Sequence, residues 1–313
     1  MSNELITAII LTYNKQDYTR LCLQGLFRTA YRPLEMILVD NGSTEDMSPM
    51  LDSIASQARK ADVDLRVIRN ETNRGAPAGR NQAIRDARGA SLLFVDNDAI
   101  PFNAGWLGRM MDGLSTLPQA GAVSARLLFP FPPHLVQFAG CGISASGRVK
   151  YLGRGAQQDD PSFTGDREVQ CLISACLLMP RALARDAGGF DEAFSPVQYE
   201  DLDLCYKIRE RGYRCYVAGG AEIYHFENVT TDGSTDINFR YVTIKNGLIF
   251  KERWKSRFQA EDGPAEDETA WLKLPHRSLD EMGPDWSPWE NEGGSAEPRD
   301  DDCERSEPCQ TSA

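Results

Sequence analysis

The stretch Ser91-Leu92-Leu93-Phe94-Val95-Asp96-Asn97-Asp98 decides the fold of this 313-residue chain. A short apolar run between turn signals predicts a buried strand, of the kind found in parallel sheets covered on both faces. The run ends in two carboxylates, Asp96 and Asp98, whose like charges repel unless a cation lies between them. Mg²⁺ and Mn²⁺ take oxygen ligands and commonly join a carboxylate to substrate phosphates. Because open α/β sheets bind ligands beyond the carboxyl ends of their strands, this strand predicts a metal–diphosphate site.

The alternative for an isolated pair of this kind is a solvated loop with two acidic residues, so the surrounding chain must decide. Upstream, three further runs predict strands at 5–11, 35–39 and 64–69. Between them, apolar spacing and capping residues predict helices from about Asp17, over roughly 46–60 and around 80–88. Repeated strand–helix alternation is typical of a mostly parallel, doubly wound α/β sheet, which is the expected fold class.

Beyond residue 100 the alternation loosens. We expect helices near 106–117, 181–187, 200–211 and 237–254, and regular extended structure at 121–128, 169–179, 214–218 and 222–225. The segment 129–165 is rich in Pro, Gly and Ser, which predicts irregular loops and short hairpin strands. From Gln259 onward acidic residues, Pro, Gly and Ser dominate. This composition predicts a domain over 1–258 and a mostly disordered acidic tail over 259–313.

Composition limits the classes of function. Apolar residues make up 41% and charged residues 26% of the chain, as in a soluble globular protein, and the net charge of -12 opposes nucleic-acid binding. No basic leader and no apolar run long enough to span a bilayer are evident. The eight cysteines lack C-x-x-C spacing, which indicates free thiols in a reducing compartment. We therefore expect a cytoplasmic protein, with contact at the inner membrane face as a further option.

Six motifs occur in order along the chain: Ile10-Leu11-Thr12-Tyr13-Asn14, Val39-Asp40-Asn41-Gly42-Ser43, Asn73-Arg74-Gly75 with Gly79-Arg80-Asn81, Phe94 to Asp98, Gly188-Gly189-Phe190-Asp191-Glu192, and Tyr199-Glu200-Asp201-Leu202-Asp203-Leu204-Cys205. Each is weak alone. Together, over about residues 5–254, they resemble glycosyltransferase family 2 with the GT-A fold. The resemblance implies a nucleotide-sugar half over about 1–100 and an acceptor and catalytic half over 101–258.

The resemblance implies a nucleotide-sugar site built from strand ends and one loop. Asp40 at the end of its strand can accept a hydrogen bond from a uracil or ribose group, or else cap the next helix. Arg80, before a helix, suits a diphosphate, the alternative being a solvated surface position. The full set expected at this site is Thr12, Tyr13, Asn14, Asp40, Asn73, Arg74, Arg80, Asp96, Asn97 and Ser174.

For the chemistry, the resemblance implies a metal ion, Mn²⁺ or Mg²⁺, held by Asp98 and His225. A lone His at a strand end is otherwise more often structural. The acidic pair Glu200-Asp201 begins a helix, whose dipole favours ionised carboxylates. By the resemblance Asp201 is the general base, with Glu200 as second choice. A base opposite the leaving diphosphate gives displacement with inversion at the anomeric carbon.

The function expected is therefore an inverting, metal-dependent glycosyltransferase that uses a UDP-sugar. A dTDP-sugar such as dTDP-rhamnose is the nearest alternative donor. A sugar nucleotidyltransferase is a second alternative, but it usually carries a Gly-rich phosphate loop where Thr12-Tyr13-Asn14-Lys15 stands. A non-catalytic binding module is the third. The sequence leaves the acceptor open among glycans, lipid-linked saccharides, proteins and small molecules.

Overall fold

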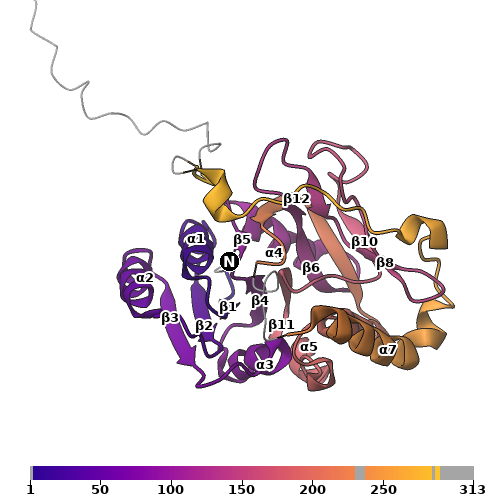
Figure 1. Cartoon of the computed structure of the whole chain (residues 1–313), viewed down its shortest axis with the longest axis horizontal. Helices are drawn as coiled ribbons and strands as arrows, with labels where there is room; N and C mark the ends of the chain where they lie inside the picture. The colour runs from indigo at the N-terminus through magenta and orange to yellow at the C-terminus, as the bar shows by residue number, and fades with distance from the viewer. Residues whose placement is uncertain (1–2, 230–236, 284–285, 290–313) are drawn as a thin grey trace, which may run out of the picture.

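A mixed sheet forms the centre of the computed structural model, which describes residues 3–229, 237–283 and 286–289 (Figure 1). Within these residues the sheet has ten strands, eight of them in the order β10-β12-β6-β11-β4-β1-β2-β3, while β5 pairs with β12 and β7 with β6. A separate two-stranded sheet joins β8 and β9. The expected mostly parallel α/β sheet is confirmed, with antiparallel strands added in the second half.

The first half of the chain alternates strands and helices as expected. The strands β1, β2 and β4 are almost wholly buried apolar runs, whereas the edge strand β3 is partly exposed. All four are parallel, so their carboxyl ends meet at one edge of the sheet. The elements are β1 (Ile6–Thr12), α1 (Gln16–Phe27), β2 (Leu34–Asp40), α2 (Ser48–Lys60), β3 (Asp64–Arg69), α3 (Ala76–Asp86) and β4 (Ser91–Asp96).

Helix α3 begins at Ala76, four residues before the expected start at Arg80. Gly75 precedes it with a φ of 81°, and Pro77 lies in its first turn, where a missing N–H costs nothing. A Cβ at Gly75 would lie 2.5 Å from the Ser195 hydroxyl, so this turn also packs closely against the loop before α6 (Glu200–Glu210). The early start places Arg80 in the second turn of the helix, facing the protein interior.

The second half is joined to the first through β11 (Cys176–Pro180), which runs antiparallel between β4 and β6. The single run expected over 169–179 is wrong, because β10 ends at Val169 and β11 begins only at Cys176. The two strands also have different partners: β10 pairs with β12, whereas β11 pairs with β4 and β6. The short hairpin strands expected within 129–165 are confirmed. The remaining elements are β5 (Ala99–Ile100), α4 (Trp106–Thr116), β6 (Ala120–Leu128), β7 (Val136–Phe138), β8 (Cys141–Ile143), β9 (Val149–Tyr151), β10 (Arg167–Val169), α5 (Arg181–Asp186), η1 (Glu192–Phe194), β12 (Arg214–His225), α7 (Phe239–Phe258), η2 (Glu266–Thr269) and η3 (Leu279–Met282).

Residues 259–283, here called the C-terminal strap, cross the domain from the end of α7 back toward α1 (Figure 1). The carboxylate of Glu261 accepts hydrogen bonds from Gln170 (2.8 Å), Tyr206 (3.2 Å) and Arg209 (3.1 Å). Further along, the Leu279 N–H donates to the Tyr18 hydroxyl at 2.7 Å. The disorder expected from Gln259 is therefore wrong for the strap, because long-range partners anchor a segment whose own composition is polar. Residues 290–313 of the expected tail lie outside the described residues.

The six described cysteines are all free and buried, as expected for core thiols, while Cys303 and Cys309 fall outside the described residues. Among the helices that the structure describes, none combines the length and the apolar character needed to cross a membrane.

Candidate active site

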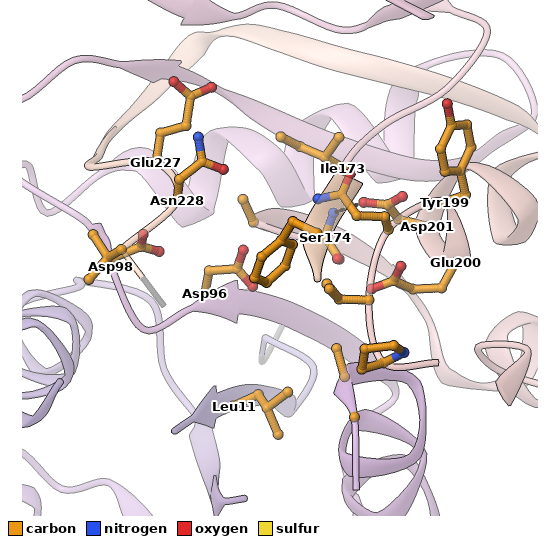
Figure 2. Close-up of a pocket in the computed structure, with 18 of the residues that line it drawn as sticks. Leu11, Asp96, Asp98, Ile173, Ser174, Tyr199, Glu200, Asp201, Glu227 and Asn228 are labelled. Atoms are coloured by element: carbon orange, nitrogen blue, oxygen red, sulfur yellow. Dashed lines mark hydrogen bonds between the residues drawn. The ribbon is translucent and has the colours of Figure 1, made fainter. Parts of the chain in front are cut away.

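A cavity of about 660 Å³ opens at the carboxyl edge of the parallel strands. It is lined by ten of the residues that the sequence singles out: Tyr13, Asn73, Arg80, Asp96, Asn97, Asp98, Ser174, Glu200, Asp201 and His225. In the view of Figure 2, Asp96 lies between Asp98 on one side and Glu200 and Asp201 on the other. The cavity therefore brings together the end of β4 and the start of α6, which are about a hundred residues apart in sequence.

Three potential metal ligands gather at one end of this cavity. The ligand atoms of Asp96, Asp98 and His225 all lie within 4.8 Å of one another. They meet because β12 pairs antiparallel with β5, which sets His225 opposite Ala99, the residue after Asp98. The His225 Nε2 lies 3.3 Å from Asp98 Oδ1. Two carboxylates and an imidazole form a donor set that suits a divalent cation such as Mn²⁺.

Gln137 on β7 fixes the orientation of the His225 ring. Its amide oxygen lies 2.6 Å from His225 Nδ1, and its amide nitrogen donates to the His225 carbonyl at 3.1 Å. Because that second bond orients the amide, Nδ1 is the proton donor to Gln137 and Nε2 faces the carboxylates. An outer partner of this kind holds a histidine ligand in the tautomer that leaves Nε2 for a metal.

The charges of this cluster stabilise one another. Burial disfavours ionised Asp98, but the neighbouring His225 outweighs burial and lowers the pKa of Asp98 below its ordinary value. Burial likewise opposes protonation of His225, and Asp98 outweighs it and raises the pKa of His225. Asp98 and His225 thus each favour the charged form of the other, as expected for neighbouring groups of opposite charge.

Arg80 joins the two ends of the cavity. Its guanidinium donates to Asp96 Oδ1 at 2.7 Å and to Glu200 Oε1 at 2.9 Å, and it stacks over the Phe190 ring with 5.3 Å to the centroid. Arg80 is 6% exposed and Glu200 2%. Burial disfavours the charged guanidinium, but the two carboxylates outweigh it and raise the pKa of Arg80. The sequence predicts that this guanidinium binds a diphosphate, whereas in the structure it is already paired with two carboxylates.

The acidic pair at the start of α6 differs in its surroundings. Asp201 Oδ2 accepts the Ser174 N–H at 3.1 Å, and its Oδ1 accepts the Leu202 N–H at 2.8 Å. Burial, and then the neighbouring charge of Glu200, raise the pKa of Asp201 to about 8. Burial also raises the pKa of Glu200, whose Oε2 has no hydrogen-bond partner among the described residues. Asp201 is thus the carboxyl of this pair that is poised to hold a proton near neutral pH.

The loop that leads into α6 has an unusual backbone. Gln198 and Tyr199 both have positive φ, at 84° and 75°. The Asn246 side chain from α7 offsets this strain by donating to the carbonyls of Phe194, Val197 and Gln198 at 2.6, 2.9 and 3.0 Å. Strained backbone that neighbouring contacts hold in place is common at functional sites. Here it fixes the direction in which α6 presents its first two carboxylates.

Two of the expected nucleotide residues support the cavity without lining it. Thr12 is 1% exposed, and its hydroxyl contacts Thr19 at 2.8 Å and accepts from Asn97 Nδ2 at 3.3 Å. Asn14 Oδ1 accepts the backbone N–H groups of Thr44 and Glu45 at 2.8 and 3.1 Å. These contacts tie the turn after β1 to its neighbours, so both side chains shape the wall next to Tyr13.

Asp40 and Arg74 also lie outside the cavity lining. Asp40 Oδ1 accepts the Ser43 N–H at 2.9 Å, and its Oδ2 accepts from Arg69 at 3.3 Å. Arg74 is exposed, and its backbone N–H donates to Asn41 Oδ1 at 3.2 Å. Asp40 therefore stabilises the turn after β2 and does not cap the next helix, α2, whose N-cap residue is Met47.

Two cavity residues have roles that the sequence did not single out. Asn41, inside the Asp40-Asn41-Gly42 motif, donates to Asn73 Oδ1 at 3.0 Å and to the Gly75 carbonyl at 3.3 Å, which fixes the loop before α3. Its place in a quoted motif is a signal that could have identified it. Gln137 has no local signal, because its role depends on the pairing of β7 with β6 and of β6 with β12.

Comparison with known proteins gives a family match over part of the chain. Residues 7–139 match the model described as Glycosyl transferase family 2. The chain is 28% identical over 260 residues to uncharacterized protein y4gI of Sinorhizobium fredii, covering 80% of this chain and 28% of that protein. It is 28% identical over 233 residues to O-antigen biosynthesis protein RfbC of Myxococcus xanthus, covering 72% and 17%. It is 23% identical over 247 residues to N-acetylglucosaminyl-diphospho-decaprenol L-rhamnosyltransferase of Mycobacterium tuberculosis, covering 73% and 78%. The chain thus spans less than a third of the first two relatives.

Solved structures show the same fold. GalNAc-T7, in a structure with UDP, GalNAc and Mn²⁺, superposes with a TM-score of 0.64 at 15% identity, covering 82% of this chain and 49% of that one. The mannosyltransferase PcManGT of Pyrobaculum calidifontis, with GDP-Man and Mn²⁺, gives a TM-score of 0.57 at 20% identity, covering 83% and 65%. Over residues 7–139 the chain matches glycosyl transferase family 2, and the structural neighbours show that the chain has the GT-A fold.

Proposed function

We propose that the protein transfers a sugar from a nucleotide-diphosphate donor to an acceptor hydroxyl or other nucleophile, with inversion at the anomeric carbon. The observation that carries the proposal is one cavity that contains both a cluster of three potential metal ligands and a carboxyl, Asp201, whose pKa is raised to about 8. A general base works best when its pKa lies near the working pH. Such a transfer needs both features: a metal ion to stabilise the leaving diphosphate, and a base to deprotonate the acceptor.

Asp96, Asp98 and His225 would hold the divalent metal ion. Their ligand atoms already converge, and Gln137 orients the imidazole, so the residues fit an ion such as Mn²⁺ or Mg²⁺. A bound ion supplies positive charge that stabilises the departing nucleoside diphosphate. A nitrogen ligand beside two carboxylates favours Mn²⁺ over Mg²⁺.

The remaining chemistry belongs to Asp201. Its carboxylate takes the proton of the acceptor hydroxyl while the acceptor oxygen forms a bond to the anomeric carbon. The bond from that carbon to the diphosphate oxygen breaks, and its electron pair leaves with the nucleoside diphosphate. Glu200 is less suited to this role, because it is 2% exposed and paired with Arg80. Arg80 instead holds Asp96 and Glu200 in fixed positions on either side of the reacting groups.

Tyr13, Asn73, Asn97 and Ser174 line the cavity and are proposed to contact the donor. Thr12, Asn14, Asp40 and Arg74 are proposed to shape the loops around it. UDP-sugars are the proposed donors, and the GalNAc-T7 neighbour was solved with UDP and Mn²⁺. A dTDP-linked sugar is the second candidate, favoured by the similarity to a rhamnosyltransferase over 73% of the chain.

The test is a binding panel of UDP, dTDP, GDP and CDP, each with Mn²⁺ and with EDTA, read by thermal shift and calorimetry. We expect one diphosphate to raise the melting temperature only when metal is present, since a ligand that binds the folded state stabilises it. The Asp98→Asn variant is the matched control and is expected to lose the metal-dependent shift. Equal binding with EDTA would contradict the metal site, and no binding of any diphosphate would contradict the donor site.

A further inference from the structure

Trp271 of the C-terminal strap is a large aromatic residue that is exposed and yet held firmly. Its exposed fraction is 56%, and it lines the same cavity as Asp201 and Tyr151. Burying an indole in a core is normally favourable in free energy, because its apolar area is large. A tryptophan that stays exposed at the mouth of a cavity therefore needs a reason other than packing.

Two neighbours immobilise the ring. The guanidinium of Arg154 lies over the indole at 4.1 Å from its centroid, and the Tyr151 ring meets it edge-on at 5.2 Å and 73°. Cation–π and edge-to-face contacts of this kind each stabilise one ring orientation. The indole is thus fixed before any ligand arrives, and a preorganised ring loses little entropy when a ligand stacks on it.

Arg154 is in turn anchored to the strand that carries His225. It donates two hydrogen bonds to the Glu227 carboxylate, both at 2.9 Å, and its Nε donates to the Leu272 carbonyl at 2.9 Å. Glu227 follows β12 by two residues and lines the cavity. Through Arg154, the strap around Trp271 is therefore anchored to the end of β12, the strand that carries the proposed metal ligand His225.

We propose that Trp271 forms the acceptor platform, an indole face on which the ring of a saccharide acceptor stacks. The C–H groups of a sugar ring form an apolar face that can cover an aromatic ring while the hydroxyls stay hydrated or hydrogen-bonded. The residues proposed for the donor come from the ends of β1 and β4, the loop before α3 and the segment before β11, whereas Trp271 contacts β9. This inference rests on the proposed function and narrows it, since it makes the acceptor a saccharide rather than a protein side chain or a simple alcohol.

The experiment measures release of nucleoside diphosphate from nucleotide-sugars of the diphosphate that binds in the panel, with and without acceptor. The acceptors are methyl glycosides of common hexoses, a lipid-linked monosaccharide, and glycerol and a serine peptide as acceptors without a sugar ring. We compare the unchanged chain with Trp271→Ala and Trp271→Phe. Leu272→Ala is the control, because Leu272 is 49% exposed, lies next in the strap and is not among the cavity residues.

We expect a saccharide to stimulate release, and Trp271→Ala to raise its KM about tenfold or more, since an aromatic stack contributes roughly that much. Trp271→Phe should recover part of the loss, Leu272→Ala should match the unchanged chain, and the affinity for the diphosphate should be the same in all. Stimulation by the methyl glycosides would show that the ring suffices, and stimulation by the lipid-linked sugar alone would assign the acceptor to that source.

Outcomes separate this inference from the proposed function. If the unchanged chain turns over and Trp271→Ala has the same acceptor KM, the platform is refuted while the transferase proposal stands. The platform is also refuted if glycerol or the serine peptide stimulates diphosphate release as strongly as every glycoside does. If the unchanged chain neither binds a diphosphate nor releases one, the proposed function itself fails. Melting temperatures of the variants identify any loss that is due to unfolding.

Discussion

Replacing Arg80 by methionine tests the central electrostatic contact of the site. The guanidinium is 6% exposed and lies between Glu200, 2.9 Å away, and Asp96, 2.7 Å away. Removing one partner of a buried pair leaves an uncompensated charge and costs about 3–5 kcal/mol. Glu200 carries most of this cost, because it is 2% exposed and its Oε2 already has no partner among the described residues.

The loss should appear as a lower melting temperature. At roughly 2–4 °C per kcal/mol, a loss of about 3–5 kcal/mol corresponds to a decrease of about 6–20 °C. Arg74→Met is the matched control, because Arg74 is exposed and six residues earlier in the same region, and it should change the melting temperature by little. Urea unfolding at pH 7 provides the free energy of unfolding for both variants.

The double variant Arg80→Met with Glu200→Gln separates charge from packing. If the buried charge causes the loss, neutralising Glu200 should restore part of the free energy of unfolding, and the two changes should not be additive. The loss should also be smaller at pH 5 than at pH 8, because Glu200, whose pKa burial already raises, can then take up a proton. A loss below about 1 kcal/mol, or one equal to that of Arg74→Met, would refute the reasoning.

Three further predictions concern the metal site and the base. Gln137→Leu should weaken Mn²⁺ binding about 10- to 100-fold in a calorimetric titration without changing the fold, because Nδ1 of His225 loses its partner; unchanged affinity would contradict the role of Gln137. Asp201→Asn should abolish turnover, and the rate of the unchanged chain should rise with pH up to about 8, where the Asp201 carboxyl loses its proton; a pH-independent rate between pH 6 and 9 would exclude this base. Because the folded chain holds the Asp201 proton more tightly than the unfolded chain, this carboxyl contributes stability that is complete below about pH 4 and is lost as pH rises through about 8. The free energy of unfolding, measured with urea, should therefore decrease less between pH 5 and pH 8 for Asp201→Asn than for the unchanged chain.

Local patterns predicted the parts of the site that strand ends create. The apolar run before Asp96 and Asp98 predicts both a buried strand and the place where its charges emerge, since a strand's period and its end are properties of neighbouring residues. The same holds for the acidic start of α6 at Glu200, where helix and carboxylates adjoin. For Asp96 and Asp98 the sequence order alone predicts the location, because the carboxyl ends of parallel strands always meet at one edge.

Contacts between distant segments could not be predicted in this way. His225 reaches Asp98 because β12 pairs with β5, and Gln137 reaches His225 across β6 and β7. Arg80 illustrates the same limit: its place in a glycine-containing loop before a predicted helix suggested a phosphate ligand, yet the fold brings two carboxylates to it from segments 16 and 120 residues away. Residue type and local position indicate that an arginine is available, whereas its partner depends on the tertiary structure.

The C-terminal strap shows why composition misjudges a short ordered segment. Disorder is predicted when a segment has too little apolar surface to offset the entropy of ordering, an argument that treats the segment in isolation. The strap instead uses a few anchors, Glu261 on Arg209 and Trp271 on Arg154, whose partners belong to the folded domain and are already ordered. Forming each of these contacts therefore costs conformational entropy in the strap only, because the partner in the folded domain is already ordered. If Trp271 binds an acceptor saccharide, the acceptor and the strap stabilise one another, so a saturating glycoside should slow proteolysis within 259–283 in the unchanged chain and not in Trp271→Ala. Equal protection of both chains would show that the effect of the glycoside on the strap does not depend on Trp271.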